Sequence, residues 1–197
     1  MRASARSAGL IVLVAALAVV TVATAVDFGM PPGATAGVRS ASAPSDGGDE
    51  TSFLASRRLA FPVQGFENSL RDNFEEIRGG MRRHEALDIM APLGTPVVAV
   101  DDGRVAKLFR SAAGGITVYQ FDPEQKFVYY YAHLDRYAAG LVEGLTLKRG
   151  DRVGYVGSSG NAPAHAPHLH FTIFRMGPER LWWKGTPVNP YPYFASR

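Results

Sequence analysis

The chain has 197 residues, enough for one domain of ordinary size whose core does not depend on disulfides. It contains no cysteine, which excludes a disulfide framework and a thiolate zinc finger. Its 21 basic and 18 acidic side chains leave a net charge of +3, and this near-balance does not indicate a nucleic-acid partner.

The N-terminal segment has the pattern of an export signal. Arg2 and Arg6 precede any acidic residue, residues 10–22 are almost wholly apolar, and an Ala-Thr-Ala sequence ends at residue 25. Residues 1–25 are therefore predicted to be a signal peptide. An uncleaved membrane anchor is the alternative, because residues 8–26 approach the ~20 residues that span a bilayer. Both interpretations place the rest of the chain outside the cytoplasm, in the periplasm or cell envelope.

Residues 26–55 are rich in Gly, Pro, Ala, Ser and Thr and lack apolar periodicity, so they are predicted to form a flexible linker. A short helical turn is expected from Phe53 to Leu59, at the entry to the domain. Residues 56–197 are predicted to form one folded domain.

Short β-prone runs alternate with turn signals through this domain. Residues 116–121 and 126–131 flank an Asp-Pro-Glu-Gln turn, which predicts an antiparallel hairpin, and residues 168–174 are expected to form a last long strand. We therefore predict an all-β, antiparallel fold. Tyr129 and Tyr131 would share one strand face with His133, where they could line a groove or simply pack.

Two histidine clusters suggest a metal site. His84 and Asp88 are four residues apart, and His168 and His170 are two apart, so the second pair would share one face of a strand. A catalytic zinc needs three protein ligands and an open position for water. Because the chain has no cysteine, its zinc ligands would be His and carboxylate groups. The residues alone do not say whether His168 or His170 binds the metal.

Asp88 lies between Leu87 and Ile89 in a stretch that otherwise looks like a buried strand. A buried carboxylate is unfavourable unless it is paired or coordinates a metal. Metal binding is the favoured explanation, and an ion pair with Arg82 or Arg83 is the alternative.

Four blocks, in order, resemble those of the lysostaphin-like zinc endopeptidases that cleave peptidoglycan. The sequence from His84 to Val97 resembles the first signature of that family. The others are the Asp-Gly-Arg-Val turn at 102–105, the Tyr-Ala-His-Leu sequence at 131–134, and residues 157–161 together with 167–171. The resemblance runs from about residue 59 to residue 193.

The resemblance implies an all-β peptidase domain, a single antiparallel sheet or barrel of the duplicated-hybrid-motif type, with an active-site groove. It implies that His84, Asp88 and His170 bind one Zn²⁺ per domain. It further implies that His168 is the general base and that His133 stabilises the oxyanion or assists the base. The implied substrate is peptidoglycan. Stem peptides and glycine-rich bridges both remain open, as does the presence of a protein activator.

Three other functions compete with this interpretation. A non-catalytic envelope factor, which would bind peptidoglycan or activate another hydrolase, typically lacks one of these residues, and here all five are present. The turns at 102–105 and 150–153 also resemble those of lipoyl or biotin carriers and phosphotransfer domains. However, no lysine has the carrier setting, and an export signal contradicts a cytoplasmic phosphotransfer role. His165 is expected to be a surface residue.

Overall fold

The computed structural model describes residues 47–195, so the predicted signal peptide and most of the predicted linker lie outside the described residues. The described part contains two α-helices, one short 3₁₀ helix and eleven strands. In chain order these are α1 (Gly47–Ser56), η1 (Glu67–Ser69), β1 (Ile77–Arg78), β2 (Arg82–Arg83), β3 (Leu87–Met90), β4 (Pro96–Val98), β5 (Gly103–Ser111), β6 (Gly115–Phe121), β7 (Phe127–Tyr137), β8 (Thr146–Leu147), β9 (Arg152–Val156), β10 (His168–Met176), β11 (Gly185–Val188) and α2 (Tyr191–Ala195). The all-β prediction is confirmed.

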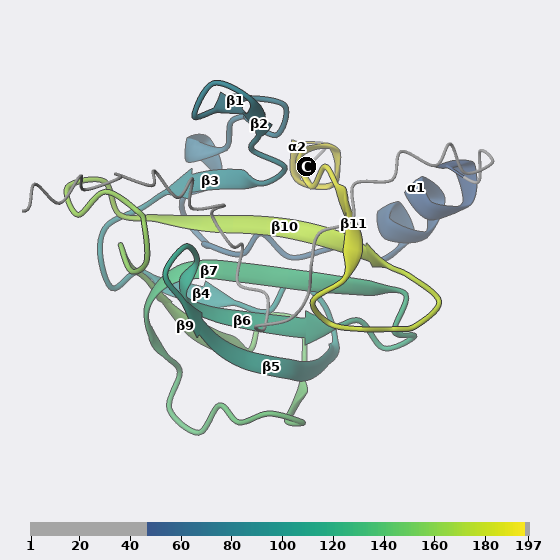
Figure 1. Ribbon diagram of the computed structural model, residues 1–197. Coiled ribbons are helices and arrows are strands. Elements are labelled where there is room, and N and C mark those ends of the chain that lie inside the picture. Colours follow the sequence, from purple (N-terminus) through teal and green to yellow (C-terminus); the bar gives the residue numbers. More distant parts are fainter. Residues whose placement is uncertain (1–46, 196–197) are drawn as a thin grey trace, which may run out of the picture.

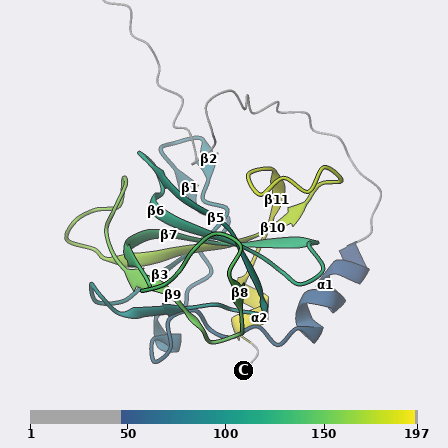
Figure 2. The same ribbon diagram turned by 90° about the horizontal axis from the view of Figure 1, so that it is seen from below.

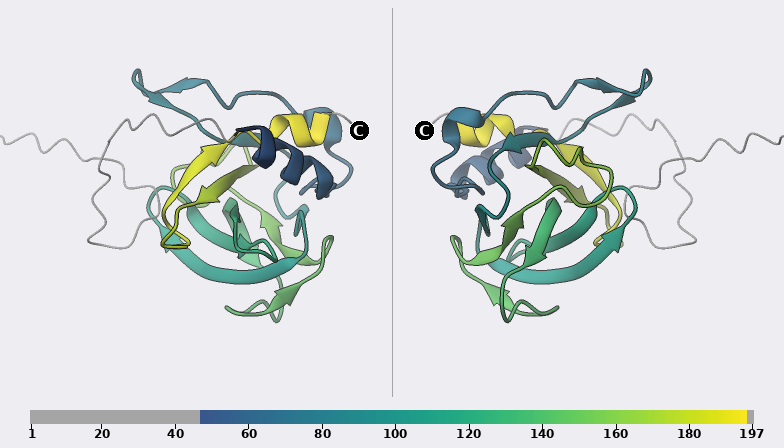
Figure 3. Two further views of the ribbon diagram at one scale, coloured as in Figure 1. Left: turned by 90° about the vertical axis from the view of Figure 1, so that its right-hand side faces the viewer. Right: turned by 90° about the vertical axis from the view of Figure 1, so that its left-hand side faces the viewer.

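Nine strands form one antiparallel sheet, with β11-β10-β7-β6-β5-β8 as its main path. Strand β3 pairs with the first half of β10. Strand β9 pairs with the end of β7 and also with β4. Figure 3 shows the strands curving into an open, barrel-like arrangement, with the helices and the β1–β2 hairpin on one side. Figure 1 shows β10 and β7 side by side across the middle of the molecule.

The predicted hairpin is confirmed as β6 and β7. Its turn is held by the buried side chain of Asp122, which accepts hydrogen bonds from the backbone N–H groups of Glu124, Lys126 and Phe127 at 3.1, 2.7 and 2.7 Å. Asp is favoured at the start of such a turn because its carboxylate accepts hydrogen bonds from several backbone N–H groups of the turn.

Helix α1 differs from the expected flexible linker and short turn, because it begins at Gly47 within the predicted linker and ends at Ser56. Two apolar residues in an otherwise polar segment explain why it folds. Leu54 is fully buried, and the ring of Phe53 stacks on Phe127 with 5.6 Å between centroids. Arg57, just after the helix, pairs with the buried Asp101 at 2.7 Å. Figures 1 and 2 both place α1 at the side of the sheet away from β3.

Among residues 47–195, no helix is both long enough and apolar enough to cross a membrane.

The main core lies under β7 and β10, where Tyr131 is fully buried. Its hydroxyl donates to Gln120 Oε1 at 2.7 Å and accepts from the backbone N–H of Val100 at 2.9 Å.

The Tyr131→Phe substitution leaves both partners unpaired in the core. We therefore expect unfolding in urea to show that the free energy of unfolding falls by about 1–3 kcal/mol. The control Tyr155→Phe removes a hydroxyl whose contact is the exposed Arg152 at 3.5 Å, so it should change stability by less than about 0.5 kcal/mol. Equal stability of the two variants would contradict this role of Tyr131.

Candidate metal centre

Strands β3 and β10 bring the two histidine clusters together. They pair antiparallel with Asp88 directly opposite His170, so the two side chains leave the same face of the sheet. His168 and His170 share that face, and Leu169 and Phe171 are fully buried in the core on the other side. The prediction from the two-residue spacing of the histidines is confirmed.

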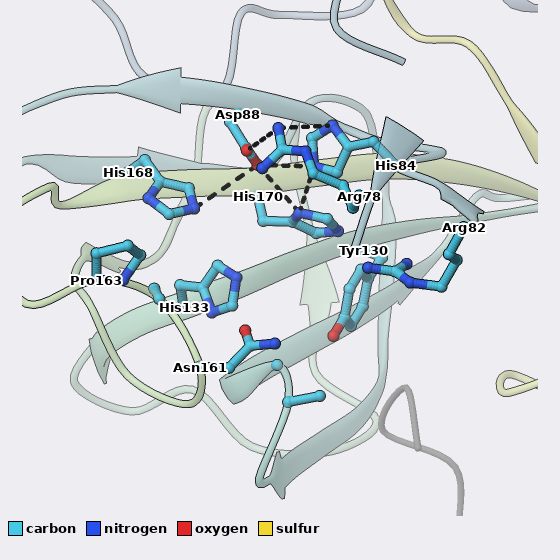
Figure 4. Close-up of a pocket in the computed structure, with 13 residues that line it drawn as sticks. Arg78, Arg82, His84, Asp88, Tyr130, His133, Asn161, Pro163, His168 and His170 are labelled. Carbon is cyan, nitrogen blue, oxygen red and sulfur yellow. Dashed lines mark hydrogen bonds and ion pairs between the residues drawn. The ribbon is translucent and has the colours of Figure 1, made fainter. Parts of the chain in front are cut away.

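Three atoms form a nearly equilateral triangle in this pocket (Figure 4). His84 Nε2 lies 3.0 Å from Asp88 Oδ1 and 3.1 Å from His170 Nδ1, and His170 Nδ1 lies 3.1 Å from Asp88 Oδ1. Zinc bonds of about 2.0–2.1 Å at tetrahedral angles separate ligand atoms by about 3.3 Å. The three residues therefore form a group that fits a tetrahedral metal ion with one open position.

The ring of His84 is oriented by a group outside this triangle. Its Nδ1 lies 3.0 Å from the backbone oxygen of Asn73, and because a carbonyl only accepts, Nδ1 carries the proton. The lone pair of Nε2 then faces Asp88 and His170. Hydrogen bonds of this kind fix the tautomer of a ligand histidine.

Arg78 holds the outer oxygen of Asp88. Its Nη2 lies 3.0 Å from Asp88 Oδ2, which leaves Oδ1 directed at the histidines. The alternative interpretation of Asp88, an ion pair with Arg82 or Arg83, is wrong about the partner. Arg83 instead pairs with the exposed Glu75, and Arg82 lines the pocket. Sequence reasoning missed both Arg78 and Asn73.

The pKa values of this group follow from burial and close contact. Burial opposes ionisation of Asp88, but the close approach of the His170 and His84 rings outweighs it and holds the pKa of Asp88 well below its ordinary value. Burial is the main cause that lowers the pKa of His170, despite the neighbouring Asp88. At neutral pH the group therefore offers an ionised carboxylate and a neutral imidazole, which are the forms that bind zinc.

His168 and His133 stand beside the triangle. His168 Nε2 lies 3.6 Å from Asp88 Oδ1, and the centroid of the His133 ring lies 5.0 Å from that of His168 and 5.5 Å from that of His170. All five predicted site residues thus meet in one pocket of about 280 Å³. His165 is exposed and does not line it, as expected.

Each of these two histidines has its Nδ1 against a backbone oxygen, Ala166 at 2.9 Å for His168 and Ser159 at 2.8 Å for His133. Both Nδ1 atoms therefore carry protons, and both Nε2 atoms are proton acceptors while the rings are neutral. Burial, with the nearby His170, lowers the pKa of His133 to about 4, so its ring is neutral at pH 7.

A bulge in β7 directs His133 into the pocket. Ile116 pairs with Leu134 and Val118 with Tyr131, so β7 has one more residue than β6 over this interval, and His133 has a φ of +59°. The bulge breaks the two-residue alternation.

The expectation that Tyr129 and Tyr131 share a face with His133 is therefore wrong. Both tyrosines are fully buried in the main core, while Tyr130 lines the pocket with its ring 6.1 Å from that of His170.

The sequence of this chain is similar to those of known peptidases. The family model "Peptidase family M23" matches residues 82–190, more than half of the chain and all five site residues. The chain is 32% identical over 145 residues to the L-Ala–D-Glu endopeptidase of Bacillus subtilis, covering 70% of this chain and 43% of that protein. It is 31% identical to lysostaphin of Staphylococcus simulans, covering 61% of this chain and 22% of that protein.

Solved structures show the same fold. A putative glycyl-glycine endopeptidase from Ruminococcus gnavus has 36% identity and a TM-score of 0.55, covering 64% of this chain and 52% of that chain. The catalytic domain of the M23 protein EnpA from Enterococcus faecalis has 28% identity and a TM-score of 0.54, covering 68% of this chain and 95% of that chain. The chain thus spans less than half the length of the curated relatives named above. It belongs to peptidase family M23.

Proposed function

We propose that this chain is an exported zinc endopeptidase that hydrolyses peptide bonds of bacterial peptidoglycan. The observation that carries the proposal is the triangle of His84, Asp88 and His170 beside two further histidines in one pocket. The names of the relatives support the substrate class, since one is an L-Ala–D-Glu endopeptidase and another a peptidoglycan DD-endopeptidase of Vibrio cholerae. The sequence pattern of residues 1–25 supports export.

Zinc at these three residues would supply Lewis acidity, lowering the pKa of a coordinated water and polarising the scissile carbonyl. His168 is placed to take a proton at Nε2, because Ala166 holds its Nδ1–H and turns the Nε2 lone pair into the pocket. Loss of that proton makes the attacking water a stronger nucleophile, and the protonated His168 can then give it to the departing amine.

We assign His133 to proton transfer rather than to oxyanion binding. Its Nδ1–H is committed to the Ser159 carbonyl, and at neutral pH its Nε2 has a lone pair and no proton. An oxyanion requires a donor, whereas this ring offers an acceptor. Of the two roles implied by the family resemblance, we therefore favour assistance to the base.

A non-catalytic envelope role is the alternative. The pocket contains all five residues that the hydrolytic chemistry needs, which favours the enzyme. Backbone oxygens orient three of them, His84, His133 and His168.

Zinc affinity is expected to fall as the solution is made acidic. The lowered pKa of Asp88 keeps its carboxylate ionised over this range. Burial lowers the pKa of His170, so protonation of this ligand weakens zinc binding at a pH below the ordinary His pKa of ~6.5. Isothermal titration with zinc between pH 7.5 and pH 4 should show the binding constant decreasing. An unchanged affinity and an unchanged hydrolysis rate down to about pH 4 would contradict a histidine-bound metal.

Digestion of purified peptidoglycan by the full-length chain tests the reaction. Mass spectrometry of the soluble products should show new peptide amino termini and name the bond. New reducing sugar ends, or no soluble product from folded, zinc-loaded protein, would overturn the proposed activity.

A further inference from the structure

Two arginines on the β1–β2 hairpin point into the same pocket. Arg78 and Arg82 are directly opposite each other in the hairpin register, so their side chains leave the same face, and both line the pocket. The neighbouring register pair is Ile77 and Arg83, whose side chains leave the opposite face. Figure 4 shows Arg78 beside Asp88 and Arg82 beside Tyr130.

This arrangement is unfavourable for the protein alone. Like charges directly opposite each other in an antiparallel pair are destabilising. The Nε atom of Arg78 is buried without a hydrogen-bond partner. An anion bound between the two guanidinium groups would relieve the repulsion.

Two carboxylates contact Arg78 through a single atom of its guanidinium group. Asp88 and Glu76 each lie 3.0 Å from the same atom, Arg78 Nη2. Asp88 Oδ1 is directed at His84 and His170, as expected of a metal ligand. Asp88 is also the only carboxylate among the residues that line the pocket, whereas two guanidinium groups line it.

We propose that Arg78 and Arg82 bind a carboxylate of the substrate, carried by a residue close to the scissile bond. A guanidinium is a planar fork that matches a carboxylate with two parallel hydrogen bonds. Because Arg78 touches Asp88, the bound carboxylate lies within a residue or two of the reacting carbonyl, consecutive Cα atoms being ~3.8 Å apart. The enzyme would then select stem peptides that carry a free carboxylate over glycine bridges, which carry none along their length.

This inference rests on the proposed peptidase function. The test uses two synthetic peptides built on the bond named by the peptidoglycan digest, identical except that the carboxylate nearest that bond is free in one and amidated in the other. With the full-length zinc-loaded chain, kcat/KM is expected to be about tenfold or more higher for the free carboxylate. The Arg82→Met substitution should reduce that preference to about twofold or less, mainly by slowing cleavage of the charged peptide, and Arg82→Lys should fall between.

The matched control is Arg83→Met. Arg83 is the next residue along the chain, is exposed, pairs with Glu75 and does not line the pocket, so the preference should be unchanged. Zinc content and melting temperature are measured for every variant. Equal cleavage of both peptides by the unmodified chain, or an equal loss on both peptides in Arg82→Met, would overturn the carboxylate site. Failure to cleave either peptide would instead count against the proposed function.

Discussion

Replacing His168 with alanine is expected to lower kcat for peptide hydrolysis by about 10²–10⁴-fold while one zinc ion stays bound. The reason is geometric. His168 Nε2 lies 3.6 Å from Asp88 Oδ1, outside the triangle of three atoms 3.0–3.1 Å apart, and its Nδ1–H is held by Ala166. The substitution would therefore remove the proposed base without removing a proposed ligand. Single-turnover hydrolysis and elemental analysis measure the two quantities separately.

His165→Ala is the matched control. His165 is also a histidine, lies three residues before His168, and is exposed outside the pocket. It should keep both rate and zinc. If His168→Ala loses its zinc, His168 is a ligand, and if it keeps its rate, another group is the base. Either result would overturn the assigned role.

Replacing Asp88 with alanine is expected to abolish both zinc binding and hydrolysis. Asp88 Oδ1 is the atom that His84, His168 and His170 all approach, and its Oδ2 holds Arg78. Loss of groups that only orient a ligand already weakens metal affinity by 10–100-fold. Loss of the ligand itself should weaken zinc affinity by more than about 100-fold in a competition titration with a chelator.

Asp102→Ala provides the comparison for that titration, because Asp102 is an exposed carboxylate that contacts Arg149 and Lys148 and does not line this pocket. Its zinc affinity should be unchanged. Circular dichroism establishes that each variant is folded. An Asp88→Ala protein that is folded and binds zinc as tightly as the parent would contradict the ligand set.

The part of the site that lies on regular strands could be predicted from the sequence. Alternation along β10 places His168 and His170 on one face, and antiparallel pairing of β3 with β10 places Asp88 opposite His170. These relations depend on strand periodicity, which residue patterns reveal directly. The choice of His170 as the ligand came only from the family resemblance, and the geometry agrees because its Nδ1 completes the triangle.

The part that depends on irregular backbone could not be predicted. The bulge at His133 moves its side chain to the face of Tyr130, and no residue type in that strand signals the extra position. Arg78, rather than Arg82 or Arg83, reaches Asp88 because the hairpin folds back over the pocket, which is a tertiary contact. Helix α1 could not be predicted because the residues around Phe53 and Leu54 are polar. The core against which these two side chains pack is formed by residues distant in sequence.

The central claim is that one zinc ion at His84, Asp88 and His170 makes this chain a peptidase. The most direct test is to strip the full-length chain of metal and return zinc in steps, while release of peptide amino groups from peptidoglycan is followed. The rate is predicted to start near zero, to rise in proportion to added zinc, and to level off at one equivalent per chain. Full activity of the metal-free protein, or a rate that does not respond to zinc in folded protein that binds it, would contradict the claim.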